Sequence, residues 1–348
     1  MSFRAPVRSP PCPSATTTLM LFRRAYLFLF LLLPPLARAQ AKDSSYAAKV
    51  RALGVKMITV DGKYRVWTQR VGKGKIKLLL LHGGPANTHE YFENFPEYLA
   101  KEGVEIYFYD QLGSCHSDQP KDTTIWRIGR FVEKVEQVRR ALKLRHFYLL
   151  GHSWGGLLAL EYAARYPKHL RGLIVSNMGY SAPIFSKYRF GLYAGIIRQQ
   201  RYGRPAAPDS LLGDNKMMPL LAKPVQDEFF HQHMLRLPRE PGPYARNLAH
   251  INRQDRAPIF PHIATWDFTA CLAIIRTPTP LLGAQHDFIP PAAYDYMHQQ
   301  MPHGQIYIYP NGSHFAMGCN SNLRLGVLSL TNTIPRHDDD QSGLPDPG

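Results

Sequence analysis

The chain has 348 residues, which is long enough for one large α/β domain or for two domains of ordinary size. Hydrophobic residues make up 45% of it, so the chain can bury a sizeable core and is not a disordered protein. The formal net charge is +16, yet the sequence has no basic helix, zinc-finger spacing or base-stacking motif, so we expect a basic, soluble surface and no nucleic-acid partner.

Residues 1–39 are predicted to be a secretory signal peptide. Two arginines precede a short apolar run at residues 26–33, and an A-x-A cleavage pattern ends at Ala39. The run is shorter than the roughly 20 apolar residues that a transmembrane helix requires. We therefore expect a secreted or periplasmic protein that is cut after Ala39 and keeps no stable membrane span, with an uncleaved anchor as the alternative. Met20 as the start would give a more usual signal-peptide length than Met1.

Strand-like and helix-like runs alternate through residues 40–180, which predicts a mostly parallel sheet flanked by helices. Asp61-Gly62 between two of the runs indicates an antiparallel hairpin. The predicted strands are residues 57–60, 64–68, 77–81, 104–109, 147–150 and 170–175. The predicted helices are residues 91–101, 125–141 and 157–166. This order is typical of the first part of an α/β fold.

The sequence GHSWGG at residues 151–156 stands between a predicted strand and a predicted helix. A G-x-S-x-G string alone is a weak signal, but strand, tight turn and helix together are typical of a nucleophile elbow. The glycines allow the turn and a close approach of helix to strand, and the serine hydroxyl is held outward. We predict that Ser153 is a nucleophile, with an ordinary strand-to-helix turn as the alternative.

The regular alternation stops at about residue 181. Residues 181–263 are rich in Pro, Arg, His and Met and show no strand pattern, while residues 183–200 and 223–235 look helical. We predict a helical cap inserted late in the chain over the sheet. Strand patterns return at residues 279–283 and 305–309. The predicted division is a signal peptide at 1–39, core at 40–180, cap at 181–263, core at 264–317 and an atypical tail at 318–348.

A serine nucleophile needs a base, and the base needs an orienting carboxylate. Asp287 follows the strand predicted at residues 279–283, and His314 follows the strand predicted at residues 305–309. The order serine, acid, histidine is that of α/β-hydrolases. We predict these residues as the acid and the base. Asp287 could instead be a helix N-cap, with Asp295 as the rival acid, and His314 could be a surface histidine.

Acyl transfer also needs backbone N–H groups that already point to the oxyanion. One donor is predicted to be the amide of Trp154, the residue after the nucleophile. The other is expected in the loop His82-Gly83-Gly84-Pro85, where glycines permit close backbone approach. We favour the amide of Gly84, with Gly83 as the rival and a simple glycine turn as the alternative.

The four cysteines do not form a disulfide framework. Cys12 lies before the predicted cleavage point, which leaves Cys115, Cys271 and Cys319, an odd number. One disulfide bond is possible, but the sequence does not select its pair. There is no C-x-x-C and no H-E-x-x-H motif, so we expect neither a zinc site nor a redox motif, and no cofactor.

Several motifs resemble the proline iminopeptidase family, whose members are serine aminopeptidases with the α/β-hydrolase fold. The motifs, in the family's order, are HGGP at 82–85, YDQLGS at 109–114, GHSWGG at 151–156, GAQHD at 283–287 and NGSH at 311–314. The resemblance implies the release of an N-terminal residue, usually proline, from short peptides with a free N-terminus. It also implies that no metal or cofactor is used, and that residues 181–263 form the cap that shapes the substrate site.

An aminopeptidase must hold the free α-amino group of its substrate. Carboxylates in the cap would do this through charge-assisted hydrogen bonds, and a closed cap would exclude longer N-terminal extensions. Glu228 and Glu240 are the candidates, with Asp227 close behind. For each of them a solvated surface charge is the alternative.

The chain departs from the family pattern in several places. The family usually has glycine where Ala86 stands, and a small or Asn-containing turn where Cys115-His116 stands. Residues 252–261 do not resemble family sequence. The family closes its fold with an amphipathic helix after Met317, whereas residues 318–348 are rich in Asn, Pro and Asp. A divergent or inactive member, or a disrupted reading frame, would account for the last two differences.

The sequence therefore favours a serine aminopeptidase and leaves two alternatives. One is a general esterase or C–C hydrolase that uses the same three residues. The other is a secreted homologue that is catalytically impaired. An epoxide hydrolase or dehalogenase is disfavoured, because these enzymes place a carboxylate at the elbow, where this chain has Ser153.

Overall fold

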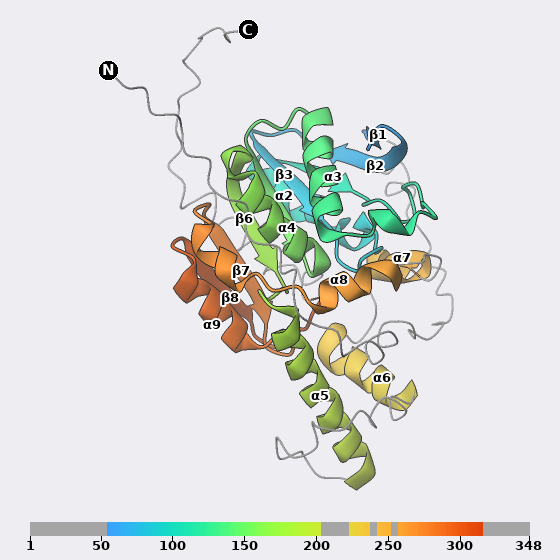
Figure 1. Cartoon of the computed structure of the whole chain (residues 1–348), viewed down its shortest axis with the longest axis vertical. Coiled ribbons are helices and arrows are strands. Elements are labelled where there is room, and N and C mark those ends of the chain that lie inside the picture. Colours follow the sequence, from blue (N-terminus) through green and yellow to red (C-terminus); the bar gives the residue numbers. More distant parts are fainter. Residues whose placement is uncertain (1–53, 203–222, 237–241, 252–256, 316–348) are drawn as a thin grey trace, which may run out of the picture.

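The computed structural model describes residues 54–202, 223–236, 242–251 and 257–315 (Figure 1). Three predicted features lie outside these ranges: the signal peptide at residues 1–39, the tail at residues 318–348, and Glu240. Among the helices described, none combines the length and the apolar character needed to cross a membrane.

Within the described residues, an eight-stranded sheet has the order β1-β2-β4-β3-β5-β6-β7-β8 (Figure 1). The strands are β1 (Val55–Val60), β2 (Tyr64–Val71), β3 (Ile76–Leu81), β4 (Val104–Tyr109), β5 (Phe147–His152), β6 (Leu170–Ser176), β7 (Thr279–Ala284) and β8 (Gly304–Tyr309). The hairpin β1-β2 and the pair β2-β4 are antiparallel, and the other pairs are parallel. The predicted hairpin and the mostly parallel sheet are confirmed.

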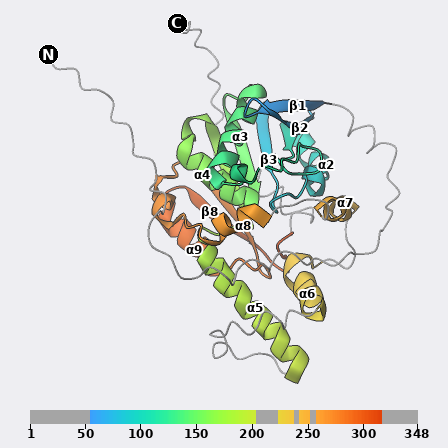
Figure 2. The ribbon, with the colours of Figure 1, turned by 45° about the vertical axis from the view of Figure 1, so that its right-hand side comes forward.

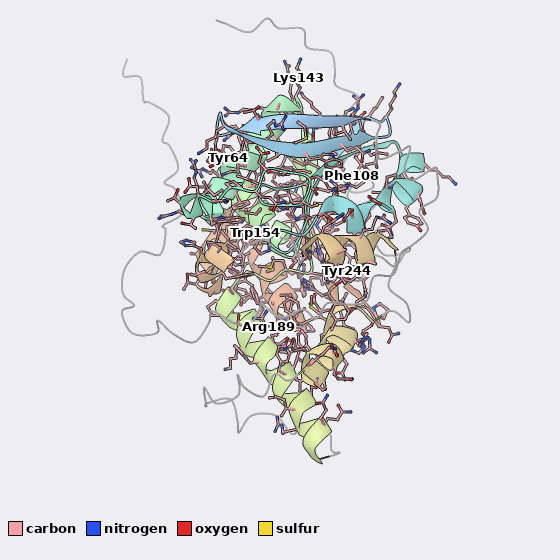
Figure 3. All side chains as sticks on the ribbon, turned by 90° about the vertical axis from the view of Figure 1, so that its right-hand side faces the viewer. Tyr64, Phe108, Lys143, Trp154, Arg189 and Tyr244 are labelled. Carbon is pink, nitrogen blue, oxygen red and sulfur yellow. The ribbon has the colours of Figure 1, made fainter. Side chains whose placement is uncertain are left out.

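Apolar layers lie on both faces of this sheet, because successive side chains of a strand point to opposite sides. Leu79 and Leu81 of β3 join one core with α3 (Ile128–Ala141), α4 (Trp154–Arg165) and α9 (Pro291–Gln300). Leu78 and Leu80 join the opposite core, which includes α2 (Phe95–Leu99). Figure 3 shows side chains filling the space between the sheet and its helices, with Trp154 in the interior.

The segment between β6 and β7 is helical where the structure describes it. It contains α5 (Ala182–Tyr202), α6 (Lys223–Phe229), α7 (Gly242–Ile251) and α8 (Phe260–Ala264). Figure 2 shows α5 extending away from the sheet with α6 beside it, while α7 packs on the 3-10 turn His89–Phe92 of the core. A bridge between Ser181 and Asp267 joins the start of this segment to the chain that returns to the core.

Two predicted helices are interrupted. Residues 91–101, predicted as one helix, form the turn His89–Phe92, α2 and the turn Ala100–Glu102. Pro96 has no N–H to donate, so it is tolerated only in the first turn of α2 and a helix cannot continue through it. Residues 223–235 form α6 and then a π-helical turn, Phe230–Met234.

Glu136 of α3 fastens α3 to the elbow helix α4. Its buried carboxylate accepts hydrogen bonds from Arg139 at 2.7 and 2.8 Å, from Arg140 at 2.6 Å and from the Tyr162 hydroxyl of α4 at 2.8 Å. Burial alone would raise the pKa of Glu136, but the hydrogen bonds from Arg139, Tyr162 and Arg140 outweigh burial and lower the pKa to about 2.

Glu136→Gln is therefore expected to lower the free energy of unfolding at pH 7 by about 3 kcal/mol. The folded pKa is depressed, so this stabilisation is present above the unfolded value of 4.5 and is lost as pH falls through about 2. Urea unfolding curves between pH 2 and 7 measure it: the difference between native chain and variant should shrink between pH 4.5 and 2. A difference that does not change over this interval would contradict the role given to Glu136.

Candidate active site

Ser153 occupies the turn between β5 and α4 in a strained backbone conformation, with φ 53° and ψ −122°. Such a conformation persists only where the surroundings enforce it. Here the Ser153 N–H donates to the Ser176 carbonyl at 2.9 Å, and two glycines let the backbones approach. A Cβ on Gly151 would lie 2.1 Å from the Gly155 carbonyl oxygen, and one on Gly155 would lie 2.1 Å from that of Leu81. The turn thus has the strand–turn–helix context of a nucleophile elbow.

A chain of hydrogen bonds connects the three residues predicted from the strand ends. Oγ of Ser153 lies 2.9 Å from Nε2 of His314, and Nδ1 of His314 lies 2.8 Å from Oδ1 of Asp287. A carboxylate can only accept, so Nδ1 carries the proton and Nε2 of the neutral ring accepts from the serine hydroxyl. His314 and Asp287 are buried, whereas Ser153 is partly exposed. The structure therefore brings together an alcohol, a base and a carboxylate in the arrangement that acyl transfer requires.

Asp287 is held by two further donors. The side-chain amide of Asn177 donates to Oδ2 at 2.8 Å, and the Ile289 N–H donates to Oδ1 at 3.3 Å. The hydroxyl of Ser176 in turn donates to Asn177 at 2.8 Å. The rival acid, Asp295, is exposed on α9. Sequence reasoning missed Asn177, although its position directly after β6 places it at the same edge of the sheet.

A second relay, also missed, runs from the glycine loop to the backbone of His314. The Gly83 N–H donates to the Tyr91 hydroxyl at 2.6 Å, and this hydroxyl lies 3.0 Å from Nδ1 of His152. Nε2 of His152 lies 2.9 Å from the His314 carbonyl, which can only accept. Burial, more than the neighbouring His314, lowers the pKa of His152 to about 3, so the ring is neutral and Nδ1 accepts from Tyr91.

This relay distinguishes Gly84 from Gly83, the two candidates for the oxyanion donor in the glycine loop. The Gly83 amide is already used by Tyr91, whereas no hydrogen bond of the Gly84 amide is found among the described residues. A Cβ on Gly83 would lie 3.0 Å from the Cβ of Ser153, so the loop approaches the elbow closely. The arrangement favours Gly84 over Gly83 as the donor from the glycine loop. The role of the Trp154 amide, at the N-terminus of α4, stays a prediction.

Gln111 connects the elbow to the glycine loop. Its side-chain oxygen accepts from the indole N–H of Trp154 at 2.8 Å, and its amide group donates to the His82 carbonyl at 2.8 Å. Its own backbone N–H donates to Nε2 of His82 at 3.0 Å, so the His82 ring donates from Nδ1 to the Gly83 carbonyl at 2.9 Å. Burial lowers the pKa of His82 to about 4, which keeps the ring neutral for this role.

Asp110, next to Gln111, holds the start of the turn His89–Phe92. Its carboxylate accepts from the backbone N–H of His89 at 2.7 Å and from the ring of His89 at 2.9 Å. Burial opposes the charge, but the charge and the hydrogen bond of His89 outweigh it and lower the pKa of Asp110 to about 2. These two hydrogen bonds between buried residues fix the turn beside the glycine loop.

The two described candidate carboxylates of the cap, Glu228 and Asp227, interact with side chains four residues away in the chain. Oε1 of Glu228 accepts from the Gln232 side chain at 2.5 Å, and Asp227 forms an ion pair with Lys223 at 2.5 Å. Glu240 lies outside the described residues. The role of these carboxylates in binding an amine stays a prediction.

The departures at the glycine loop have a physical cost. Ala86 has φ 64°, in the left-handed region that favours glycine, and it is buried. Alanine in that region costs about 1 kcal/mol relative to glycine.

Cys115 and His116, the other departure from the family pattern, lie in the loop after β4, close to His250 of α7. These side chains carry atoms that can bind a metal.

Residues 77–318 match the family model for the alpha/beta hydrolase fold. The chain is 39% identical to a proline iminopeptidase of Flavobacterium johnsoniae over 290 residues, which cover 79% of this chain and 96% of that protein. It is 40% identical to a proline iminopeptidase of Elizabethkingia meningoseptica over 278 residues, which cover 76% of this chain and 92% of that protein.

Among solved structures, the proline iminopeptidase of Mycobacterium smegmatis superposes with a TM-score of 0.68 at 21% identity, covering 80% of this chain and 98% of that one. That likeness supports the fold. The identity to the two bacterial relatives is higher and extends over nearly their whole length, and the motifs that surround Ser153 come together in one site. The chain belongs to the proline iminopeptidase family of α/β hydrolases.

Proposed function

We propose that the protein is a serine aminopeptidase that releases an N-terminal residue, with proline preferred, from short peptides. The observation that carries the proposal is the hydrogen-bonded chain from Ser153 through His314 to Asp287, set in a family whose similar members are named proline iminopeptidases. The chemistry needs no metal ion, because the base and the oxyanion donors come from the chain itself.

In the first half-reaction, the Ser153 hydroxyl attacks the carbonyl of the N-terminal residue. His314 removes the hydroxyl proton through Nε2, and the negative charge of Asp287 stabilises the imidazolium that forms. The imidazolium then returns the proton to the leaving amine, the peptide bond breaks and an acyl-enzyme remains. In the second half-reaction, His314 activates water, which releases the N-terminal residue and regenerates Ser153.

The amides of Gly84 and Trp154 are the proposed oxyanion donors. Each is worth about 3 kcal/mol of transition-state stabilisation if it lies at hydrogen-bonding distance from the developing oxyanion. Gln111 supports both donors, because it holds the Trp154 indole and the His82 carbonyl at once. The relay through Tyr91 and His152 links the same loop to the backbone of His314. The donors and the base are therefore fixed relative to each other.

The free amine of the substrate separates this proposal from a general esterase. We place its binding in the cap between β6 and β7, with Glu228 and Glu240 as the candidate carboxylates. A carboxylate that accepts from a charged amine loses that interaction when the amine is acylated, at a cost of about 3 kcal/mol, or roughly a hundredfold.

Purified protein is therefore expected to hydrolyse prolyl-naphthylamide at least about 100-fold faster, as kcat/KM, than N-acetylprolyl-naphthylamide. An aryl acetate serves as the third substrate, because it is an activated ester that tests the triad without requiring a free amine. Turnover of the aryl acetate without turnover of prolyl-naphthylamide would contradict the peptidase proposal and favour an esterase.

A fluorophosphonate label distinguishes the remaining alternative. We expect stoichiometric labelling, with the adduct mapped to Ser153 by peptide mass spectrometry. A folded sample that remains unlabelled and turns over none of the three substrates would identify an impaired homologue.

We also propose that the protein acts outside the cytoplasm after cleavage behind Ala39. Mass spectrometry of mature protein from its source should then give Gln40 as the first residue.

A further inference from the structure

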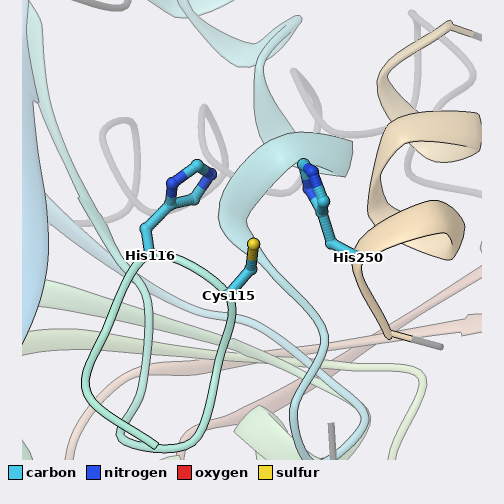
Figure 4. Close-up of side chains that lie close together, drawn as sticks. All are labelled: Cys115, His116 and His250. Carbon is cyan, nitrogen blue, oxygen red and sulfur yellow. The ribbon is translucent and has the colours of Figure 1, made fainter. Parts of the chain in front are cut away.

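Three side chains that can bind metal ions meet where the core contacts the cap segment. Cys115 and His116 lie in the loop after β4, and His250 lies at the end of α7 (Figure 4). Sγ of Cys115 and one ring nitrogen of each histidine all lie within 4.8 Å of one another. Figure 4 shows Cys115 between the two histidines. The cluster is separate from the Ser153, His314 and Asp287 chain and has no part in the proposed catalysis.

Glu90 supplies an independent observation that points to a metal. Its carboxylate is buried and accepts from Nδ1 of His250 at 2.7 Å. A histidine that binds a metal through one nitrogen almost always donates the other N–H to a carboxylate or carbonyl, which fixes its tautomer and orientation. With Nδ1 bound to Glu90, Nε2 of His250 is the nitrogen that remains for an ion.

Glu90 is itself held in place. The Thr88 hydroxyl donates to the same carboxylate at 2.8 Å. The two hydrogen bonds thus hold the buried carboxylate in position against His250.

One thiolate and two imidazoles are ligands that suit zinc. A tetrahedral zinc ion, with bonds of about 2.3 Å to sulfur and about 2.0 Å to nitrogen, holds its donor atoms about 3.5 Å apart. The donors here lie within 4.8 Å, so they need to approach one another by no more than about 1.3 Å. Side-chain rotation supplies such a movement, and His116 is exposed, so an ion can enter from solvent.

A rival set of ligands shares one residue with this cluster. His89, Asp110 and His116 also lie within 4.8 Å of one another. Nδ1 of His89, however, is already paired with Asp110 at 2.9 Å, and both side chains are buried. His116 is therefore the ligand available for an ion, and Cys115 and His250 complete the better set.

We propose that Cys115, His116 and His250 bind one Zn²⁺ ion, with water in the fourth position, and that the ion joins the loop after β4 to α7. On binding, the Cys115 thiol releases its proton to solvent and the thiolate binds zinc. The ion would reinforce contacts that already hold α7 to the core. Asn247 accepts from the Thr88 N–H at 2.8 Å, and Arg246 pairs with Glu93. Zinc binding therefore stabilises the packing of α7 against the core.

No zinc site was expected from the sequence, because the ligands follow no recognised zinc spacing. Cys115-His116 is one of the places where the chain departs from the family pattern, and His250 comes from a distant segment of the chain. Only the packing of α7 against the turn His89–Phe92 brings the ligands together.

The direct test is cobalt substitution of the full protein, purified without a polyhistidine tag and kept reduced with a phosphine. One equivalent of Co²⁺ should give visible bands of tetrahedral cobalt together with thiolate-to-cobalt charge transfer, and one equivalent of Zn²⁺ should abolish both. Cys115→Ser should lose the charge-transfer band. Cobalt bound without that band would overturn the proposal.

Affinity for zinc provides a second readout. His116→Ala is expected to weaken zinc binding at least about 100-fold. Glu90→Gln, which removes the charged partner of His250 and no zinc ligand, should weaken it about 10-fold. The exposed His146, which lies outside the cluster, is the matched control, and His146→Ala should bind as the native chain does. Equal zinc affinity of native chain, Cys115→Ser and His116→Ala would overturn the proposal.

Zinc should also raise the melting temperature, by about 5 °C at concentrations a hundredfold above Kd. Melting in EDTA establishes that each variant is folded, so a lost response reports lost binding. Hydrolysis of the aryl acetate in EDTA should be the same for Cys115→Ser and the native chain. The outcome does not depend on the peptidase proposal, since neither binding nor melting requires Ser153.

Discussion

Replacing Ser153 with alanine is expected to reduce kcat for prolyl-naphthylamide by about 10⁶-fold, because the alcohol that forms the acyl-enzyme is removed. His314→Ala is expected to cost about as much, and the double variant should be no worse than either single one. Residues that act as a unit lose their whole effect when one is removed. Single-turnover assays of the three variants measure this directly.

The control for this experiment is Ser186→Ala. Ser186 is a partly exposed serine of α5 with no place in the proposed chemistry, so its replacement should leave kcat unchanged. Each variant should also keep the melting temperature of the native chain to within a few degrees. Additive losses for Ser153→Ala and His314→Ala, or a folded Ser153→Ala protein with more than about one hundredth of the native rate, would contradict the assignment.

The individual strands could be predicted from sequence because the signals for them are local. A continuous apolar run such as the four leucines of β3 predicted a buried strand, and Asp61-Gly62 predicted the hairpin. The helices were harder, because their continuity depends on single residues. Pro96 interrupts the helix predicted at residues 91–101, and α6 changes to a π-helical turn at Phe230, for which the sequence carries no recognised signal.

The three members of the candidate triad were also accessible from sequence. Parallel strands end at one edge of the sheet, so residues that follow β5, β7 and β8 must lie near one another, and Ser153, Asp287 and His314 do so. The residues that hold them were not accessible. Tyr91 acts through side-chain hydrogen bonds to segments distant in sequence, which no periodicity or spacing reveals. Asn177 could be placed at this edge by its position after β6, but not its hydrogen bond to Asp287.

The contacts of Gln111 explain why separate motifs of the family accompany each other. Gln111 belongs to one motif, Trp154 to another and His82 to a third, yet the Gln111 side chain bonds to both of the others. A single carboxamide thereby sets the distance between the elbow and the glycine loop. The proposed oxyanion donors lie on those two segments, so the motifs form one structural unit rather than independent signals.

Asp287→Asn is expected to lower kcat by about 10⁴-fold with little change in KM, because the base would lose the partner that fixes its tautomer. Asp287 now accepts from Nδ1 of His314 through one oxygen and from Asn177 through the other. An asparagine keeps only one acceptor oxygen. If that oxygen faces Asn177, its NH₂ group faces Nδ1 of His314 and forces the proton to Nε2, where it can no longer accept from Ser153.

Asp295→Asn is the matched control, since Asp295 is the rival acid and is exposed on α9. It should leave kcat within about twofold of the native value, because surface charges on a solvated helix contribute little. A large loss in Asp295→Asn with a small one in Asp287→Asn would reverse the assignment of the acid. If Asp287→Asn lost kcat and also melted at a much lower temperature, the carboxylate would instead support the fold. The expected split, a large loss of kcat in a protein that melts normally, is the signature of a residue that orients the base.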